Sequence, residues 1–208
     1  MLEIYRIIHR DNLDYILRSK RVVAPAHAGA DPDYISIGDN EIIKKRAQRT
    51  IPIRTERTFQ NYVAFYFGYR SIMLFNIHTG FGNVLKHEQE FIIYLVFNVH
   101  KIVESGLDYF FTDGQGNQRN TRFFDDLAQI DQVDLNAAYA TNWSAEAQQL
   151  DPDIKRKKHA EFHIFNEVPI VFLSYIAVQN ESARLFVSPI IQRHSLQIPV
   201  IIKPEFYY

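Results

Sequence analysis

Glu161 is the residue of this chain with the strongest claim to a chemical role. It follows a run of four cations at 155–158 and comes shortly before an apolar stretch at 168–173. An ionised carboxylate at the start of a buried strand needs a partner or a task. A single carboxylate near cations and aromatic rings suits chemistry at a cationic sugar carbon. There the carboxylate stabilises an oxocarbenium-like transition state while arginines hold phosphates.

Other catalytic patterns are missing from the sequence. It contains no G-x-G-x-x-G, no P-loop, no G-x-S-x-G and no H-E-x-x-H. It has no cysteine, which excludes disulfides and thiolate metal sites. His159, Glu161 and His163 could bind zinc, because alternation on a strand directs all three to one side. The adjacent basic run would repel a cation, so we expect no metal.

The bulk composition is that of an ordinary globular protein. The 208 residues favour one domain over 1–208 and carry a net charge of −1, with 47% hydrophobic residues. Any contact with nucleic acid must therefore come from local basic patches. No apolar run approaches the roughly 18 residues of a membrane span. We expect a cytoplasmic protein with no membrane partner.

The N-terminal elements that would position a site begin with a strand over 2–9 that ends at His9. A helix should follow, with Leu13, Ile16 and Leu17 on one face. The spacing alone leaves open whether the histidine is a ligand or structural.

A long irregular stretch at 22–38 contains two prolines and two glycines, which is typical of a lid or binding loop. Asp39 or Asn40 should cap a short helix over 41–49, with Ile42 and Ile43 facing inward. Its outer face carries Lys44, Lys45, Arg46 and Arg49. That face is either solvated or a site for anions.

The rest of the chain mixes strands and short helices without a regular βαβ alternation, which predicts an α+β fold. Strands are expected at 61–67, 90–99, 107–111, 170–178 and 198–203. Helices are expected after Gly68 and at 100–105, 123–130 and 181–186, the third with Phe123, Leu127 and Ile130 on its inner face. The run at 90–99 is apolar throughout, as in a central strand that is covered on both faces.

Five segments, in register through most of the chain, resemble one known family. They are IYRIIHRDNLDYIL at 4–17, ISIGDNEIIKKR at 35–46, NYVAFYFGYRSIM at 61–73, FTDG at 111–114 with TRFFDDL at 121–127, and KRKKHAEFHIFNEVP at 155–169. Together they resemble the DarT family, the DNA ADP-ribosyltransferase toxins of bacterial toxin–antitoxin systems.

The resemblance implies an activity, a fold and partners. The family transfers ADP-ribose from NAD, its only cofactor, to a base in single-stranded DNA. Its fold is similar to that of the poly(ADP-ribose) polymerases, an α+β ADP-ribosyltransferase fold in which short helices flank a central split β-sheet. We expect a monomer, with a DarG-like macrodomain antitoxin that removes the mark. Two alternatives stay open: transfer to protein or RNA, and a noncatalytic nucleic-acid-binding module in which Glu161 is structural.

The resemblance also assigns residues. Glu161 aligns with the catalytic glutamate, and Arg46 with an arginine beside the bound dinucleotide that is important for transfer. The implied NAD contacts are His9, Asn12, Gly38, Tyr66, Phe67, Arg70 and Met73. The cations expected to meet the DNA backbone are Arg49, Arg119, Arg122, Lys155, Lys157 and Lys158, with 155–158 as a substrate-presenting loop.

Three positions depart from the family pattern. Gln115 replaces the histidine of the usual Thr-Asp-Gly-His, which bears on the choice of DNA base more than on the use of NAD. Ala64 and Ile72 stand where prolines are frequent.

Overall fold

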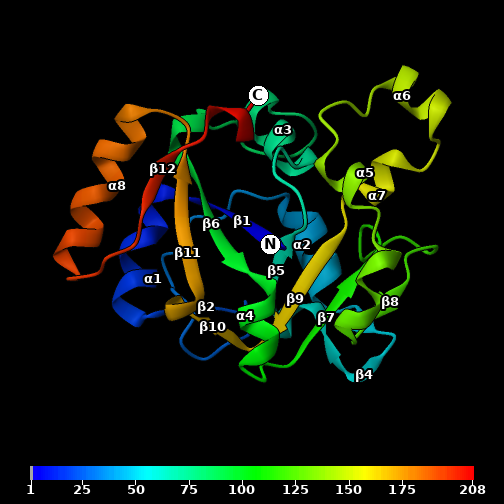
Figure 1. Ribbon diagram of the computed structural model, residues 1–208, viewed down its shortest axis with the longest axis horizontal. Helices are drawn as coiled ribbons and strands as arrows, with labels where there is room; N and C mark the ends of the chain where they lie inside the picture. The colour runs from blue at the N-terminus through cyan, green and yellow to red at the C-terminus, as the bar shows by residue number, and fades with distance from the viewer. Residues whose placement is uncertain (1) are drawn as a thin grey trace.

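An eight-stranded mixed sheet forms the centre of the molecule in the computed structural model, which describes residues 2–208 (Figure 1). The strand order is β12-β11-β6-β1-β5-β9-β7-β8, and all neighbours are antiparallel except β11 and β12. These strands are β1 (Glu3–His9), β5 (Tyr62–Tyr66), β6 (Ile92–Asn98), β7 (Tyr109–Thr112), β8 (Phe123–Phe124), β9 (Glu161–Phe165), β11 (Leu173–Val178) and β12 (Val200–Ile202). The sheet and its short helices confirm the predicted α+β class.

The sheet is nearly divided between β1 and β5. β1 pairs with β6 from Glu3 to His9, but with β5 through the single pair Tyr5 and Tyr66. β5 then pairs with β9 along its whole length. The result is two half-sheets that meet along a seam with little backbone bonding, and the expected split is present.

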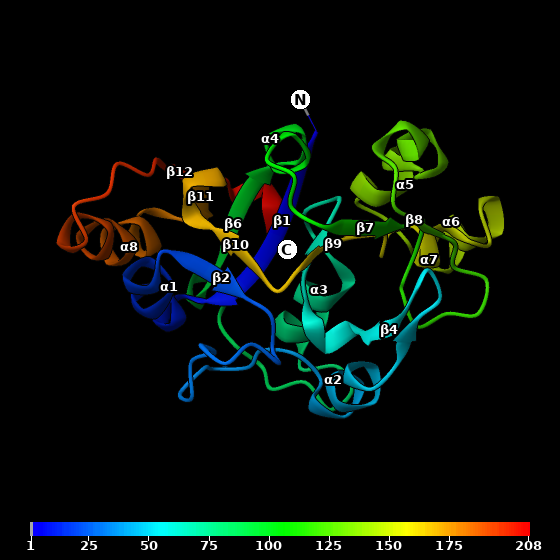
Figure 2. The same ribbon diagram turned by 90° about the horizontal axis from the view of Figure 1, so that it is seen from below.

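The apolar run of β6 is buried on both faces, as its composition predicts. Ile93, Leu95 and Phe97 belong to one core cluster, while Tyr94 and Val96 belong to another. The first cluster is covered by α1 (Leu13–Ser19), α4 (Val99–Glu104) and α8 (Glu181–Arg193). The second is covered by α3 (Ile72–Thr79) and the C-terminal residues around η6 (Pro204–Phe206). Figure 2 shows α1 and α8 together beside one half-sheet.

Smaller elements surround the second half-sheet, which consists of β5, β9, β7 and β8. Two separate two-stranded sheets are β2 (Arg21–Val23) with β10 (Glu167–Pro169), and the hairpin of β3 (Thr50–Ile51) with β4 (Arg54–Thr58). The remaining α-helices are α2 (Asn40–Ala47), α5 (Leu135–Tyr139), α6 (Ala145–Leu150) and α7 (Ile154–Lys157). Short 3₁₀ turns are η1 (Arg10–Asn12), η2 (Phe59–Asn61), η3 (Gln89–Phe91), η4 (Leu127–Gln132) and η5 (Ile170–Phe172).

Several element predictions were wrong in detail. Ile42 and Ile43 on α2 are each 41% exposed and do not face a core, because the helix lies over the seam and buries no residue of its own. Residues 123–130 form β8 and part of η4 rather than one helix, since Phe124 pairs with Phe111 of β7.

The other differences concern boundaries. The strand expected at 170–178 begins only at Leu173. The helix expected at 181–186 continues past Pro189 to Arg193, because Ala183, Val187 and Ile191 repeat every four residues and bury one face. The basic run at 155–158 lies mainly in a helix, α7, and not in a loop. Within residues 2–208, no helix is long and apolar enough to cross a membrane.

Candidate active site

Glu161 begins β9 in the middle of the second half-sheet. It is paired across the strands with Tyr66 of β5 and Thr112 of β7, and it is 2% exposed. His163 lies two residues further on the same face, between Ala64 and Phe110. Three strands therefore fix the position of this carboxylate.

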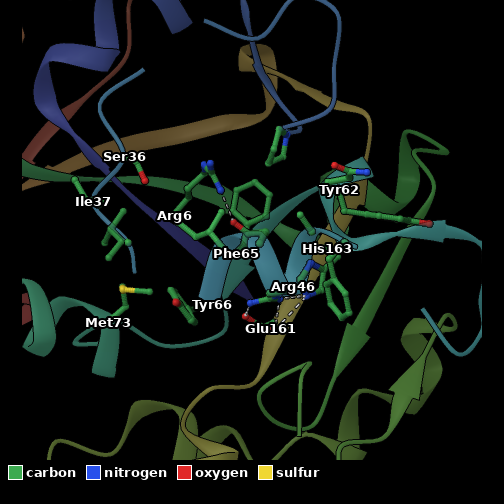
Figure 3. A pocket seen from close by; sticks show the side chains of 18 of the residues that line it. Arg6, Ser36, Ile37, Arg46, Tyr62, Phe65, Tyr66, Met73, Glu161 and His163 are labelled. Atoms are coloured by element: carbon green, nitrogen blue, oxygen red, sulfur yellow. Dashed lines mark hydrogen bonds and ion pairs between the residues drawn. The ribbon is translucent and has the colours of Figure 1, made fainter. Parts of the chain in front are cut away.

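Arg46 of α2 meets that carboxylate in a two-point ion pair (Figure 3). Its Nη1 donates to Oε1 and its Nη2 to Oε2, both at 2.7 Å. The guanidinium also lies over the ring of Phe59, 4.6 Å from the ring centroid. This planar fork is the strongest common geometry between an arginine and a carboxylate.

Gly116 supplies a third contact to the carboxylate. Its backbone N–H donates to Oε2 of Glu161 at 3.1 Å. A Cβ atom at Gly116 would come within 2.8 Å of two ring carbons of Phe59 and within 3.1 Å of Oε2. Only glycine brings this backbone so close to both neighbours.

The loop that carries this glycine is held by its own side chains. Thr112 donates its hydroxyl hydrogen to the Gly114 carbonyl at 2.7 Å, and Thr121 does the same to the Gln115 carbonyl at 2.7 Å. Asp113 accepts hydrogen bonds from Arg122 and Arg156. Gln115 therefore stands directly before the residue that touches Glu161.

Burial and charge oppose each other at Glu161. Burial raises the pKa of this carboxyl, but the Arg46 charge and the contacts with His163 and Arg46 outweigh it, so the pKa lies well below its ordinary value. Glu161 is ionised at neutral pH.

His163 lies against the same carboxylate without carrying a charge of its own. Its Nε2 is 3.4 Å from Oε2 of Glu161, and its ring stacks on Phe110 at 4.4 Å between centroids. Burial lowers the pKa of His163 despite the nearby carboxylate, which keeps the ring neutral. Nε2 also lies 3.4 Å from Nη2 of Arg46, and Nδ1 is buried without a hydrogen-bond partner.

A cavity of about 330 Å³ opens in front of these groups, along the seam between β1 and β5. Its walls include Arg6, Ile37, Gly38, Arg46, Phe59, Tyr66, Met73, Glu161 and His163. A second cavity of about 230 Å³ shares Arg6, Pro25 and Tyr34 with the first, and extends toward Asn12 and Tyr15. The long loop between β2 and α2 contributes to both cavities, in keeping with its predicted binding role.

The structure brings together five of the residues assigned to the reaction and to NAD. Gly38, Arg46, Tyr66, Met73 and Glu161 all line the first cavity.

Asn12 lines the second cavity, and its amide is engaged with the loop. Its Nδ2 donates to the Ile35 carbonyl, and its Oδ1 accepts the Ile35 N–H, both at 2.9 Å. Asn12 therefore lines the second cavity and also holds the loop at Ile35 in place.

Three residues assigned to NAD lie outside these two cavities. His9 is 7% exposed, accepts the Asp11 N–H and packs against His87. Phe67 is fully buried in the core against Phe111 and Phe162, because alternation turns it to the face opposite Tyr66. Arg70 has a φ of 50° and lies over the ring of Tyr208.

The cations assigned to DNA differ in their availability. Arg119 and Lys155 are exposed, and Arg49 is half-buried. Arg122 has a side chain that is 58% exposed, although it bonds Asp113 and Gln132.

The last two cations are held by the protein itself. Lys157 pairs with Asp151 at 2.8 Å and with Asp134 at 3.4 Å. Lys158 is 2% exposed, donates to the Ala138 carbonyl at 3.2 Å and lies over Trp143. Burial, with the Arg70 charge, lowers the pKa of Lys158 to about 8. This ammonium offers no surface to a polymer, which corrects the view of 155–158 as one presenting loop.

Sequence reasoning missed Phe59 and Gly116, and it considered His163 only as a metal ligand. Phe59 lies in a 3₁₀ turn before β5 and carries no local signal of its contact with Arg46. The position of His163, two residues after Glu161, was the one available hint. In the part of the chain that the structure describes, residues 2–208, no three metal-binding side chains cluster.

Known proteins that are similar to this chain are DNA ADP-ribosyltransferases. Residues 5–208 match the family described as "ssDNA thymidine ADP-ribosyltransferase, DarT". A DNA ADP-ribosyl transferase of Escherichia coli O127:H6 is 31% identical over 205 residues, which cover 99% of this chain and 93% of that protein.

Two solved structures are similar over the whole chain. Thermus sp. 2.9 DarT in complex with ADP-ribosylated single-stranded DNA superimposes with a TM-score of 0.90 at 30% identity, covering 100% of this chain and 96% of that one. The complex of the same protein with NAD⁺ gives 0.86 at 30% identity, covering 100% and 98%. The predicted family, fold and enzyme class are confirmed. The chain belongs to the DarT family of single-stranded DNA thymidine ADP-ribosyltransferases, which use NAD as their substrate.

Proposed function

We propose that this chain transfers ADP-ribose from NAD to thymidine in single-stranded DNA, with Glu161 and Arg46 as its catalytic pair. The observation that carries the assignment is the buried carboxylate of Glu161, which three groups hold at the wall of a cavity. The family match and the similarity to a DarT bound to modified DNA support the substrate class.

Glu161 acts on the sugar. Its ionised carboxylate accepts a hydrogen bond from the nicotinamide ribose and stabilises the positive charge that develops as the glycosidic bond lengthens. Tyr66, its cross-strand neighbour, flanks the nicotinamide ring. Nicotinamide leaves with the electron pair of the glycosidic bond, the base bonds to the sugar carbon, and the proton that the base then releases passes to water.

Arg46 binds a negatively charged group during the reaction. A guanidinium cannot serve as a base at neutral pH, so Arg46 pairs with a phosphate or with the charge that develops on the attacking base. Either role requires it to release at least one oxygen of Glu161. The two residues therefore exchange partners as the substrates bind.

The DNA strand is held by the exposed cations Arg119, Arg122 and Lys155, together with the half-buried Arg49. Gln115, next to the glycine that touches Glu161, contributes to the choice of base. Lys157 and Lys158 support the fold of this region.

Family membership supports the wider setting. We assign the chain a role as the toxin of a toxin–antitoxin pair, with a macrodomain antitoxin that removes the mark. One sheet with a core cluster that spans both halves supports a single domain over 1–208. We assign this domain a monomeric state. We assign the reaction to the cytoplasm, where NAD and DNA are both available.

The test is incubation with NAD and single-stranded oligonucleotides, followed by intact-mass analysis of both DNA and protein. We expect one ADP-ribose on thymidine-containing strands, none on strands that lack thymidine, and no adduct with Glu161→Ala. Consumption of NAD without labelled DNA would instead identify a protein or RNA target.

A further inference from the structure

Arg156 connects α7 to the loop that touches Glu161. The helix leads into β9, which begins at that carboxylate (Figure 1). Nη1 of Arg156 donates to Oδ1 of Asp113 at 2.7 Å and to the Asp113 carbonyl at 3.2 Å. A Cβ atom at Gly114 would collide with the same side chain, at 2.8 Å from its Cγ. The arginine therefore packs closely on the backbone of this loop and also pairs with its carboxylate.

The ion pair between Arg156 and Asp113 is buried and charged. The two side chains are 13% and 6% exposed. Burial raises the pKa of Asp113, but the hydrogen bonds from Arg122 and Arg156 outweigh it, so the pKa lies below its ordinary value. Desolvation offsets much of the attraction in a buried pair, so its net contribution to stability is often small. Its main effect is then on geometry, because it fixes the distance between α7 and the loop.

The contacts around this pair form a closed path that leaves Glu161 through the backbone and returns to its carboxylate. On the backbone side, the His159 N–H donates to the Arg156 carbonyl at 3.0 Å, which holds the turn between α7 and β9. The side chain of Arg156 then reaches Asp113 in the loop. Three residues further along that loop, the Gly116 N–H donates to Oε2 of Glu161 at 3.1 Å. One arginine therefore links the start of the strand to the donor that meets its carboxylate.

We propose that Arg156 is a positioning residue for the reaction. Through Asp113 it holds the Gly116 N–H on the carboxylate of Glu161. The inference rests on the proposed function, because it requires Glu161 to act on the nicotinamide ribose. In that reaction Arg46 must release at least one oxygen of the carboxylate, whereas the backbone donor stays in place. A donor that is fixed before the substrate arrives keeps the carboxylate directed at the sugar while the guanidinium moves.

A purely structural role in packing α7 is the competing explanation. Arg156→Gln removes the charge and shortens the side chain, while Arg156→Lys keeps the charge but loses the planar fork. Asp113→Asn keeps the shape of the acceptor and removes its charge, which provides a milder test from the other side of the pair. Asp153→Asn is the matched control. Asp153 pairs with the same guanidinium at 2.6 Å, but it lies three residues earlier in the chain and its side chain is 38% exposed.

The experiment combines kinetics with hydrogen exchange. Nicotinamide release in the presence of single-stranded DNA gives kcat and the KM for NAD, and NMR follows the exchange of single amides. For Arg156→Gln we expect kcat to fall about 10- to 100-fold, as for a small displacement of a reacting group. The KM for NAD should change by less than about threefold. The Gly116 amide should lose at least about tenfold of its protection while the amides of β9 keep theirs. Asp113→Asn should act in the same direction, Arg156→Lys should recover part of kcat, and Asp153→Asn should match the wild type.

The outcomes separate positioning from folding and from the proposed function. Unchanged kcat or unchanged protection of the Gly116 amide in Arg156→Gln would overturn the positioning role. A lower thermal midpoint with protection lost throughout β9 would assign Arg156 to the fold and overturn that role as well. If the wild type releases nicotinamide but labels no DNA, and Arg156→Gln slows this release with loss of protection at Gly116, the positioning role stands and the proposed transfer to DNA fails.

Discussion

Arg46 occupies both carboxylate oxygens of Glu161, each at 2.7 Å. The proposed catalytic carboxylate thus has a full set of partners before any ribose arrives, with Gly116 and His163 on Oε2. A ribose hydroxyl must compete with a guanidinium for this acceptor. In the proposed reaction, the ion pair would couple the binding of NAD to the release of Arg46.

Replacing Glu161 with Gln should abolish transfer and also destabilise the protein. At pH 7 the half-buried Arg46 loses its counter-charge, which costs about 2–4 kcal/mol of unfolding free energy. Because the pKa of Glu161 is depressed in the folded state, the stability from its ionised form is present above the unfolded value near 4.5 and is lost as the pH falls through the folded value. Urea titrations at several pH values should show the wild-type advantage shrinking below about pH 4.5. An advantage that grows on acidification would contradict this account.

Arg46→Lys should not rescue the enzyme. A lysine keeps the charge but cannot reach both carboxylate oxygens in one plane. We expect kcat on single-stranded DNA to fall by about 10²-fold or more in both Arg46→Lys and Arg46→Gln. Arg18→Lys, at an exposed position on α1, is the control and should behave as the wild type. Activity of Arg46→Lys within a few-fold of the wild type would show that the fork geometry is dispensable.

Gly116→Ala should lower kcat more than it raises the KM for NAD. The new methyl group would collide with the ring of Phe59 and crowd Oε2 of Glu161, so the carboxylate is displaced. Adding Phe59→Leu removes the ring and should restore part of kcat, although it also removes the contact with Arg46. Steady-state kinetics of the two single variants and the double variant measure the coupling. Additive losses would mean that the collision is not the cause.

His163→Phe should move the acid limb of the pH–rate profile upward. The phenyl ring can keep the stacking on Phe110, but the contact with Oε2 of Glu161 is lost. That contact lowers the pKa of Glu161, so its removal raises this pKa and activity disappears at a higher pH on acidification. The profile of kcat/KM against pH, extended on the acid side to the lowest pH at which both proteins stay folded, tests the direction of the shift. An unmoved acid limb would leave His163 with a packing role only.

The basic run should divide into one DNA contact and two structural residues. Lys155→Gln should weaken DNA binding and reduce the salt slope by about one, as for the loss of one phosphate contact. Lys157→Gln and Lys158→Met should leave that slope unchanged, because one lysine is ion-paired and the other is buried. Fluorescence anisotropy with labelled oligonucleotides at several salt concentrations separates the three. Equally reduced salt slopes for all three variants would instead indicate that residues 155–158 contact the DNA together.

Local patterns predict the centre of this fold well and its seam poorly. The apolar run from Ile92 to Phe97 could only be a doubly covered strand, since no residue in it tolerates solvent. Nothing in β1 or β5 indicates that they share a single pair, because each strand alternates normally along its own length. Arg6 therefore looks like an ordinary polar position in the sequence, although it lines both cavities.

The sequence predicts a site residue where an unusual side chain gives a local signal. It does not predict contacts between residues that are far apart along the chain. A lone acid before an apolar strand pointed to Glu161. Its partner Arg46 lies 115 residues away along the chain, and only the family resemblance connected the two. Gly116 contributes a backbone N–H, which no side-chain pattern reports. Ile43 shows the reverse error, because helical periodicity predicts a core contact where the structure has the wall of a cavity.

Because the sheet is divided, some residues of the hydrophobic core also shape the cavity along the seam. Across the seam the backbone contributes one registered pair, so side-chain volumes set its width, as where Phe65 of β5 packs edge-to-face on Phe97 of β6 at 5.3 Å. Substitutions at such buried rings should change the width of the cavity along the seam without breaking a strand ladder. Mutations in the hydrophobic core at the seam should therefore change the KM for NAD as well as the stability of the fold.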